Sequence, residues 1–361
     1  MTPLRVRVPG KLMLAGEYAI LEPGALALVL AVDRYLRVEL IPAPDYRLCS
    51  DLAPDWVYEP SILATLNPPP ELGFAVAALQ LGWQYLQAEL LPLGPFSLQL
   101  SSELHTEQRK LGLGSSAAVC VGVLAALLAA AGRDLADPQI RAQLYKLALI
   151  AHRGVQGSGS GADIAASIFG SVTAYTCPDL DRLPLQAPLD KLLSLDWPML
   201  ALAKLPWPVG WRLYFGWTGA AAHTAELIED YRRWRRDDPD GFAEFSFDAA
   251  TNSMGLGEAL RQADPDAFAA GISRARRQLQ RMGEEWPEPP ETPALAALAD
   301  AAEVLGGAGK FSGAGGGDCG LAWVDPSQAE ALFSAWQAAG IEPLDLDLDT
   351  LGVCLDPVFG G

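Results

Sequence analysis

The sequence predicts an α+β protein built from two domains. Its 361 residues exceed the usual size of one domain, and a hydrophobic content of 50% is enough for two buried cores. Three strand-like segments precede the first clear helix, so the chain does not open with repeated βαβ units. A proline- and leucine-rich stretch at 177–210 then separates two halves. We therefore expect domains at 1–190 and 191–361.

The first half begins with strands and continues with helices. Apolar and alternating runs predict strands at 4–8, 25–32, 35–41, 96–100 and 171–175. Helical periodicity predicts helices at 72–90, 116–131 and 138–152, and a short one from 162. The glycine- and serine-rich segments of this half lie between these elements.

The second half also mixes strands and helices. Strands are expected at 211–217 and 319–324 and at the end of the chain, with helices at 221–236, 246–263, 265–282 and 293–305 and from 327. This order differs from the strict strand–helix alternation of a doubly wound sheet.

Composition excludes several classes of partner. A net charge of −18 opposes binding to nucleic acid or anionic lipid, and no stretch of about twenty uncharged apolar residues predicts a membrane span. The five cysteines form no C-x-x-C pair, which argues against a zinc cage or a disulfide framework. The N-terminal segment MTPLRVRVPGKLML lacks the apolar core of a signal peptide. These observations predict a cytoplasmic protein.

The segment KLGLGSSAAV, residues 110–119, is the most informative part of the chain. Gly112 and Gly114 let the backbone approach an anion closely, and the helix that follows offers free N–H groups at its first turn. Lys110 supplies a positive charge in front of the loop. Ser115 and Ser116 add hydroxyl groups at the helix start, one of which could reach a phosphate-bound magnesium ion. The segment is typical of a phosphate-binding loop.

Alternatives remain at this point. A Walker A loop would place its lysine at the end of the loop, whereas Lys110 precedes it. The pattern G-x-G-x-x-A from Gly112 to Ala117, with Asp134 about twenty residues on, matches a dinucleotide fingerprint, although the polar segment SSELHTEQRK separates it from its strand. An ordinary helix cap is the third interpretation.

Three further segments carry polar groups beside glycines. PGKLMLAGEYAILEPG (9–24) places Lys11 after a predicted strand and a Pro-Gly turn, where the ammonium group could face a pocket or form a surface salt bridge. VQGSGSGADIAAS (155–167) presents Asp163 at a helix start, where it could simply stabilise the helix dipole. KFSGAGGGDCG (310–320) has five glycines in eleven residues, which is typical of backbone N–H groups that line an anion. Three of the six lysines, Lys11, Lys110 and Lys310, lie in or beside these loops, where a small anion needs local positive charge.

Taken in order, PGKLMLAGEYAIL, KLGLGSSAA and KFSGAGGGDCG resemble the three motifs of the GHMP kinases, which phosphorylate small metabolites with ATP and magnesium. The resemblance covers nearly the whole chain. It implies a two-domain GHMP kinase fold, with a ribosomal-S5-like N-terminal domain, a ferredoxin-like C-terminal domain and an active site between them. GEYAILEPG, GADIAAS, FGWTGAAAHT (215–224) and GGGDCG resemble the members that transfer the γ-phosphoryl group of ATP to 5-phosphomevalonate.

The resemblance also implies site residues. Lys11 and Asp163 match the catalytic pair, and Ser116 matches a magnesium ligand. ATP binding is implied for Lys110, Gly112, Leu113, Gly114, Ser115, Ser116 and Ala117. Acceptor binding is implied for Lys11, Glu17, Tyr18, Ser158, Ser160, Gly313, Ala314 and Gly315. The expected partners are ATP, Mg²⁺ and 5-phosphomevalonate, with no nucleic acid or membrane, and the chain is expected to be a monomer or a homodimer.

The acceptor decides the mechanism. A phosphate acceptor is already largely anionic at neutral pH, so Lys11 and magnesium would offset repulsion and Asp163 would orient Lys11 or the acceptor. The hydroxyl of mevalonate would instead need Asp163 as proton acceptor. His152 lies near the position where mevalonate kinases carry a second magnesium ligand, a glutamate, and imidazole suits magnesium poorly. His152 and Arg153 could face the acceptor phosphate, but a solvated helix end is the simpler interpretation.

Other functions stay open from the sequence. Within the family these are mevalonate kinase, homoserine kinase and diphosphomevalonate decarboxylase. Outside it they are a nicotinamide-dependent oxidoreductase that uses Gly112 to Ala117, and a metabolite sensor without catalytic activity. The presence of both Lys11 and Asp163 argues against the sensor.

Overall fold

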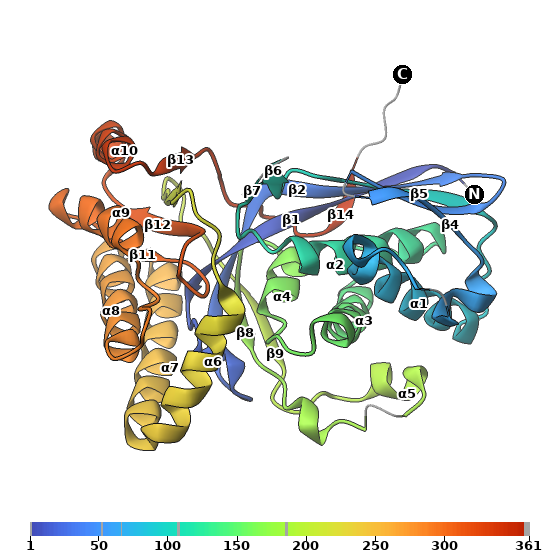
Figure 1. Ribbon diagram of the computed structural model, residues 1–361, viewed down its shortest axis with the longest axis horizontal. Helices are drawn as coiled ribbons and strands as arrows, with labels where there is room; N and C mark the ends of the chain where they lie inside the picture. The colour runs from blue at the N-terminus through green and yellow to red at the C-terminus, as the bar shows by residue number, and fades with distance from the viewer. Residues whose placement is uncertain (1, 52, 66, 107–108, 185–186, 357–361) are drawn as a thin grey trace.

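The structure is a computed structural model that describes residues 2–51, 53–65, 67–106, 109–184 and 187–356. It has two lobes, each a sheet covered by helices (Figure 1). The strands and green helices of the first half form the right side of Figure 1, and the yellow to red helices of the second half form the left side. An α+β protein was expected, and the structure agrees.

A long sheet forms the N-terminal domain. Its strand order is β14-β1-β2-β5-β3-β4, with β8 paired to β2 and β9 to β8. The strands are β1 Leu4–Ala15, β2 Leu26–Pro42, β3 Tyr46–Ser50, β4 Ala53–Tyr58, β5 Phe96–Ser102, β8 Val172–Thr176, β9 Ala201–Leu205 and β14 Cys354–Asp356. Apart from this sheet, β6 His105–Thr106 pairs antiparallel with β7 Arg109–Lys110. The pairing of β3 with β5 is parallel, and the other pairings are antiparallel.

Helices cover one face of this sheet in two layers. They are α1 Gly73–Ala88, α2 Ser115–Ala130, α3 Pro138–Gln156, α4 Ala162–Phe169 and α5 Leu189–Ser194. α2 contacts β1 and β2 on one side and α1 and α3 on the other, which explains why this helix is apolar all round. Its first turn therefore stays at a fixed position relative to β1.

The C-terminal domain has a smaller antiparallel sheet in the order β11-β12-β10-β13. Its strands are β10 Tyr214–Trp217, β11 Ala308–Phe311, β12 Cys319–Trp323 and β13 Glu342–Leu344. Its helices are α6 Thr224–Asp237, α7 Pro239–Gln262, α8 Pro265–Gly283, α9 Pro293–Val304 and α10 Ala329–Ala338. α8 and α9 each start with proline after a capping Asp or Thr, and the expected helices at 265–282 and 293–305 start at these same residues. α7 also starts with proline after a capping Asp, but at Pro239 and not at the expected residue 246.

Short 3₁₀ turns complete the fold. They cover Ala19–Leu21, Pro60–Thr65, Pro70–Leu72, Leu180–Arg182 and Pro326–Gln328. The first of them follows β1 and faces the C-terminal domain, where Tyr18 and Ala19 join a buried apolar cluster with Leu227 and Tyr231 of α6.

Two expectations need correction. The predicted strands at 25–32 and 35–41 are one strand, β2, because β8 pairs with its first part and β5 with its second. The expected boundary after residue 190 falls inside α5, and β9 still pairs with β8 in the large sheet. The sheets instead divide the chain between β9 and β10, and β14 returns to pair with β1. Proline content alone could not locate this division, because strand pairing decides it.

Candidate active site

Lys11 lies inside β1 and not after it. The Pro-Gly pair expected to form a turn is an irregularity within the strand, where the register with β2 shifts between Pro9 and Gly10. The backbone N–H of Lys11 donates to the carbonyl of Leu113 at 3.0 Å, so β1 is bonded directly to the loop before α2. Its side chain is 10% exposed, and Nζ lies 3.5 Å from Oδ2 of Asp163.

The two glycines of the phosphate-type loop are fixed by close neighbours. Gly114 immediately precedes α2 with a φ of 80°, and a Cβ there would lie 2.9 Å from Cγ of Lys11. Gly112 has a φ of 73°, and a Cβ there would lie 2.7 Å from Oδ2 of Asp318. Both positions combine a left-handed backbone with no room for a side chain. The N–H groups at the start of α2 therefore lie beside Lys11.

Asp163 lies in the first turn of α4, after a tightly held loop. Gly161 caps the helix with a φ of 86°, and Oγ of Ser160 accepts a bond of 3.3 Å from the N–H of Ala162. Arg153, in the last turn of α3, donates from Nη1 to the carbonyl of Gly159 at 3.1 Å. A carboxylate at a helix N-terminus is favourable. The Asp163 side chain is 39% exposed and can reach both Lys11 and a ligand.

His152 is buried, which contradicts the expectation of a solvated helix end. Its ring stacks on Phe74 with centroids 5.1 Å apart, and Nε2 lies 3.1 Å from Oγ of Ser116. Burial lowers the pKa of His152, although Asp163 opposes this shift. The ring is then neutral at pH 7, and Nε2 can accept the hydroxyl proton of Ser116.

The glycine-rich segment of the C-terminal domain meets this cluster. The N–H of Met13 in β1 donates to Oγ of Ser312 at 2.7 Å, and Sγ of Cys319 donates to the carbonyl of Leu111 at 3.0 Å. The N–H of Gly316 donates to the carbonyl of Pro290 at 2.7 Å. The glycine loop, residues 312–318 between β11 and β12, is thus bonded to β1 and to the segment between α8 and α9, and Cys319 at the start of β12 is bonded to the loop before α2.

Glu17 and Lys310 form a buried ion pair between the two domains. Their side chains are 1% and 0% exposed, and Nζ of Lys310 also donates to the carbonyl of Phe311. The sequence predicts that the charge of Lys310 attracts an anion. This prediction is wrong, because Glu17 compensates that charge inside the protein. The pair holds β11 against the end of β1.

Asp318 was not singled out from the sequence, yet it joins three segments. Its N–H donates to the carbonyl of Ala220 at 2.7 Å, and its carbonyl accepts from the N–H of Thr218 at 2.9 Å. Its side chain packs against Gly112. An acidic residue that closes a run of three glycines was the available signal.

The other predicted residues occupy simpler positions. Leu113 and Ala117 are buried, so they offer their backbone and not their side chains, while Ser115 and Ser158 are half-buried. Gly313 has a φ of 85°, and a Cβ there would meet nothing within 4 Å. A Cβ at Gly315 would lie 2.3 Å from the carbonyl oxygen of Pro290. The side chain of Lys110 lies outside the described residues.

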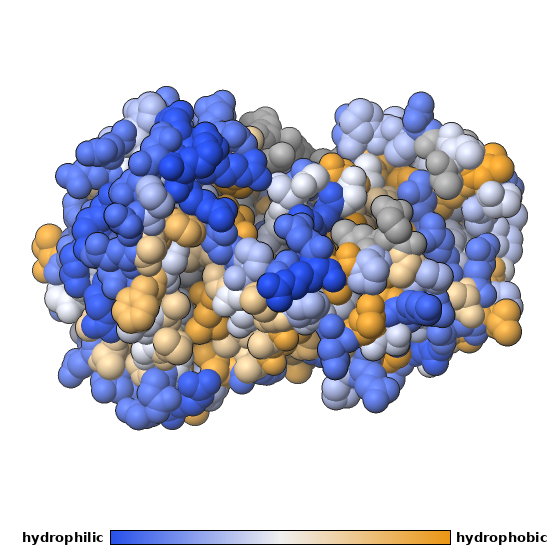
Figure 2. Space-filling view, turned by 90° about the horizontal axis from the view of Figure 1, so that it is seen from below, coloured by the Kyte–Doolittle hydropathy of each residue, from blue (hydrophilic) through white to orange (hydrophobic). Residues whose placement is uncertain are grey.

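The motif residues meet at the junction of the two lobes. Figure 2, seen from below, shows that the molecule is narrower between the two lobes.

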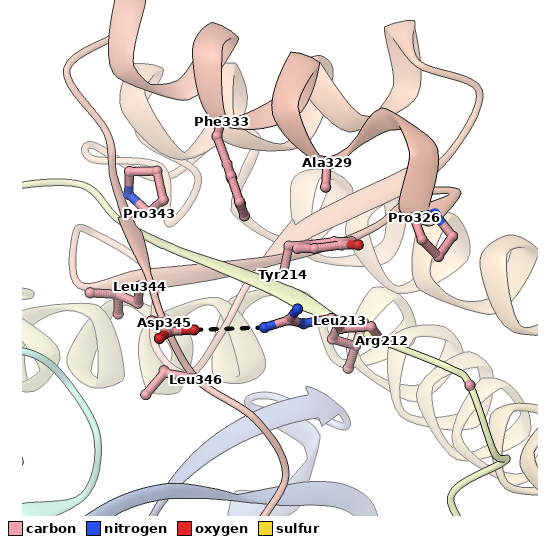
Figure 3. Close-up of a pocket in the computed structure, with 11 residues that line it drawn as sticks. Arg212, Leu213, Tyr214, Pro326, Ala329, Phe333, Pro343, Leu344, Asp345 and Leu346 are labelled. Atoms are coloured by element: carbon pink, nitrogen blue, oxygen red, sulfur yellow. Dashed lines mark ion pairs between the residues drawn. The ribbon is translucent and has the colours of Figure 1, made fainter.

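Two further cavities lie away from this junction. One, of about 570 Å³, lies between β10, β13 and α10, where Arg212 pairs with Asp345 at 3.6 Å (Figure 3). The other, of about 1080 Å³, lies between α7 and α8, and its lining includes Pro290, whose carbonyl accepts from the N–H of Gly316. Neither cavity is lined by Lys11 or Asp163.

The chain is similar to known proteins over most of its length. Residues 74–171 match the model of the GHMP kinases N terminal domain, and residues 257–342 match that of the GHMP kinases C terminal domain. The phosphomevalonate kinase of Streptomyces sp. (strain CL190) is 36% identical over 94% of this chain and 95% of its own. The chain therefore belongs to the GHMP kinase family.

More specific similarities lie within the family. The structure of Streptococcus pneumoniae phosphomevalonate kinase in complex with phosphomevalonate and AMPPNP has a TM-score of 0.83 and 28% identity, and the match covers 95% of this chain and 99% of that one. The structure of the Lin0012 protein from Listeria innocua has a TM-score of 0.91 and 32% identity, over 99% and 100% of the two chains. The mevalonate kinase of Arabidopsis thaliana is 26% identical over 53% of this chain and 62% of its own.

No helix in the described ranges is long and apolar enough to cross a membrane.

Proposed function

We propose that this chain is a phosphomevalonate kinase, which transfers the γ-phosphoryl group of ATP to 5-phosphomevalonate and releases 5-diphosphomevalonate and ADP. The observation that carries the proposal is the ion pair of Lys11 and Asp163, which lies against the N-terminus of α2 at the junction of the two domains. The near-full-length similarity to the Streptomyces phosphomevalonate kinase supports the choice of acceptor.

The ATP phosphates bind at residues 112–117 in this proposal. The N–H groups in the first turn of α2 have no acceptor within the helix, and the positive end of the helix dipole lies there. The left-handed backbone of Gly112 and Gly114 brings the chain close to the anion. Lys110 precedes the loop and adds positive charge in a protein whose net charge is −18.

Lys11 and Asp163 act on the transferred group. An oxygen of the acceptor phosphate is already largely ionised at neutral pH, so the reaction needs no strong general base. The main barrier is the approach of two anions, and the ammonium group of Lys11 lowers it by placing positive charge near the transferred phosphoryl group. Asp163, 3.5 Å from Nζ, keeps the Lys11 side chain directed toward that point.

Magnesium would be held by Ser116 together with phosphate oxygens, and it would neutralise charge on the nucleotide. The donor set fits, because a hydroxyl oxygen suits magnesium, and a neutral His152 ring with its proton on Nδ1 would accept a hydrogen bond from the Ser116 hydroxyl and leave the lone pairs of Oγ for the ion. In the part of the chain that the structure describes, no group of three or more His, Cys, Asp or Glu residues could hold a metal ion. Binding would therefore depend on the nucleotide.

The acceptor occupies the space between the loop at 158–160 and the glycine loop in this proposal. Ser158, Ser160, Gly313, Ala314 and Gly315 remain the proposed contacts. The side chains of Glu17 and Tyr18 already have partners within the protein, Lys310 and the carbonyl of Ala314. In this proposal they contribute to acceptor binding by holding the neighbouring segments in place. The proposal includes a cytoplasmic location, which the five free cysteines support.

The test is a direct assay of the product. Purified protein is incubated with ATP, Mg²⁺ and either 5-phosphomevalonate or mevalonate, and ³¹P NMR follows the phosphorus signals. We expect ADP and a diphosphate signal from 5-phosphomevalonate, and no reaction with mevalonate. Phosphorylation of the mevalonate hydroxyl alone would make the chain a mevalonate kinase, and consumption of neither acceptor would refute the proposal.

A further inference from the structure

The backbone turns unusually at Tyr18. Its φ and ψ are 60° and −51°, and the N–H of Ala19 donates to the carbonyl of Glu17 at 2.6 Å. This is a γ-turn with positive φ, as opposed to the common inverse γ-turn with negative φ. It is rare and strained in residues other than glycine. The surrounding structure must hold such a conformation in place.

The turn sends Glu17 and Tyr18 into the C-terminal domain at two points. Glu17 pairs with Lys310 at the end of β11, while the phenol O–H of Tyr18 donates to the carbonyl of Ala314 in the glycine loop. Burial raises the pKa of Tyr18, and the charge of Glu17 acts in the same direction, so the phenol stays protonated and remains a donor. One strained turn therefore contacts both the strand before the loop and the loop itself.

The ring of Tyr18 is fixed from both sides. It packs edge-on against Trp286 with centroids 5.5 Å apart and lies 5.4 Å from the ring of Tyr231 in α6. Trp286 belongs to the segment that also carries Pro290, whose carbonyl accepts from the N–H of Gly316. The glycine loop is thus held at Ala314 by the N-terminal domain and at Gly316 by the C-terminal domain.

We infer that Tyr18 is a positioning residue, which fixes the glycine loop of the C-terminal domain through its hydrogen bond to Ala314 and so sets the geometry of the acceptor site. The inference rests on the proposed function, because it takes residues 313–315 as acceptor contacts. It gives Tyr18 a role other than direct contact with the acceptor, since its hydroxyl is already used within the protein.

Two neighbouring tyrosines provide a matched test. Tyr231 is buried in the same cluster, but its hydroxyl has no hydrogen-bond partner in the described part of the chain. Tyr18→Phe and Tyr231→Phe each remove one hydroxyl from the same environment and keep the ring. Loss of a hydrogen bond worth about 1 kcal/mol corresponds to roughly a fivefold change. We expect Tyr18→Phe to lower kcat/KM for 5-phosphomevalonate about fivefold and Tyr231→Phe to leave it unchanged. Because the same hydrogen bond is lost from the folded state, the melting temperature of Tyr18→Phe should lie about 1–2 °C below that of Tyr231→Phe.

A second measurement separates this inference from the proposed function. Hydrogen–deuterium exchange of residues 312–318 reports on the loop without any substrate. We expect faster exchange in Tyr18→Phe than in Tyr231→Phe. Equal exchange and equal kcat/KM in the two variants would overturn the inference, as would a melting temperature of Tyr18→Phe more than about 5 °C below that of Tyr231→Phe, which would mean a general loss of structure. If the wild-type protein does not phosphorylate 5-phosphomevalonate, the proposed function fails and the exchange comparison alone decides the role of Tyr18.

Discussion

Removal of one partner from the buried pair of Glu17 and Lys310 should destabilise the protein strongly. Lys310→Met keeps the length of the side chain and leaves the carboxylate of Glu17 buried without its cation. Breaking a buried pair in this way costs about 3–5 kcal/mol. With an unfolding entropy of about 2.1 cal/mol/K per residue, a chain of 361 residues has about 0.76 kcal/mol/K, so the melting temperature should fall by about 4–7 °C.

The assay is thermal unfolding followed by circular dichroism. The control is Arg232→Met, which removes an exposed pair with Glu229 and should change stability by less than about 1 kcal/mol. A double variant, Glu17→Met with Lys310→Met, removes both buried charges and should recover much of the loss. Equal melting temperatures for Lys310→Met and Arg232→Met would refute the reasoning. So would a double variant as unstable as the sum of its single changes.

Three further predictions concern the site. Asp163→Asn should lower kcat by about a hundredfold, the scale of one lost electrostatic contact in the transition state, while calorimetry shows ATP binding unchanged; unchanged kcat contradicts the role given to this carboxylate. Gly114→Ala should reduce ATP affinity and kcat, because the added Cβ would lie 2.9 Å from Cγ of Lys11, whereas Gly132→Ala, with the same φ of 80° and open space around it, is the control for backbone strain alone. Because the pKa of His152 is lowered in the folded state, the unfolded chain takes up a proton at a higher pH than the folded chain. The free energy of unfolding should therefore fall as the pH drops below about 6.5. In His152→Gln, the free energy of unfolding measured with urea should fall less between pH 7 and pH 5 than it does in the wild type. An equal fall in both proteins argues against a buried neutral ring.

Local patterns in the sequence predicted most of the helices. Helices α8 and α9 begin where the sequence predicts, and each has proline after a capping residue, a signal that needs no tertiary contact. α7 carries the same signal at Pro239, yet the predicted helix begins only at 246. The start of α2 was equally clear, since Gly112 and Gly114 mark the backbone that precedes it. Strand pairing was not accessible in this way. The continuity of β2 and the assignment of β9 and β14 to the first sheet depend on partners far away in the chain.

The candidate site divides in the same manner. Residue types and spacing indicated the phosphate-type loop before α2, because phosphate binding needs glycine, free N–H groups and a cation in a short stretch. The roles of Lys11 and Asp163 as a pair were implied by the resemblance to GHMP kinases. Whether a given charge is available to a ligand was beyond the sequence. Lys11 and Lys310 lie in similar glycine-rich contexts, yet one is paired with the partly exposed Asp163 and the other with the buried Glu17.

The sequence by itself determined the family, the order of the loops and the chemical groups that they carry. Only the tertiary structure decided which of these groups face each other. It buried His152 against Ser116, bonded Tyr18 to the carbonyl of Ala314 and neutralised Lys310. The physical reason is that burial and pairing depend on contacts between residues up to about three hundred positions apart, whereas propensity, capping and turn chemistry act within a few residues.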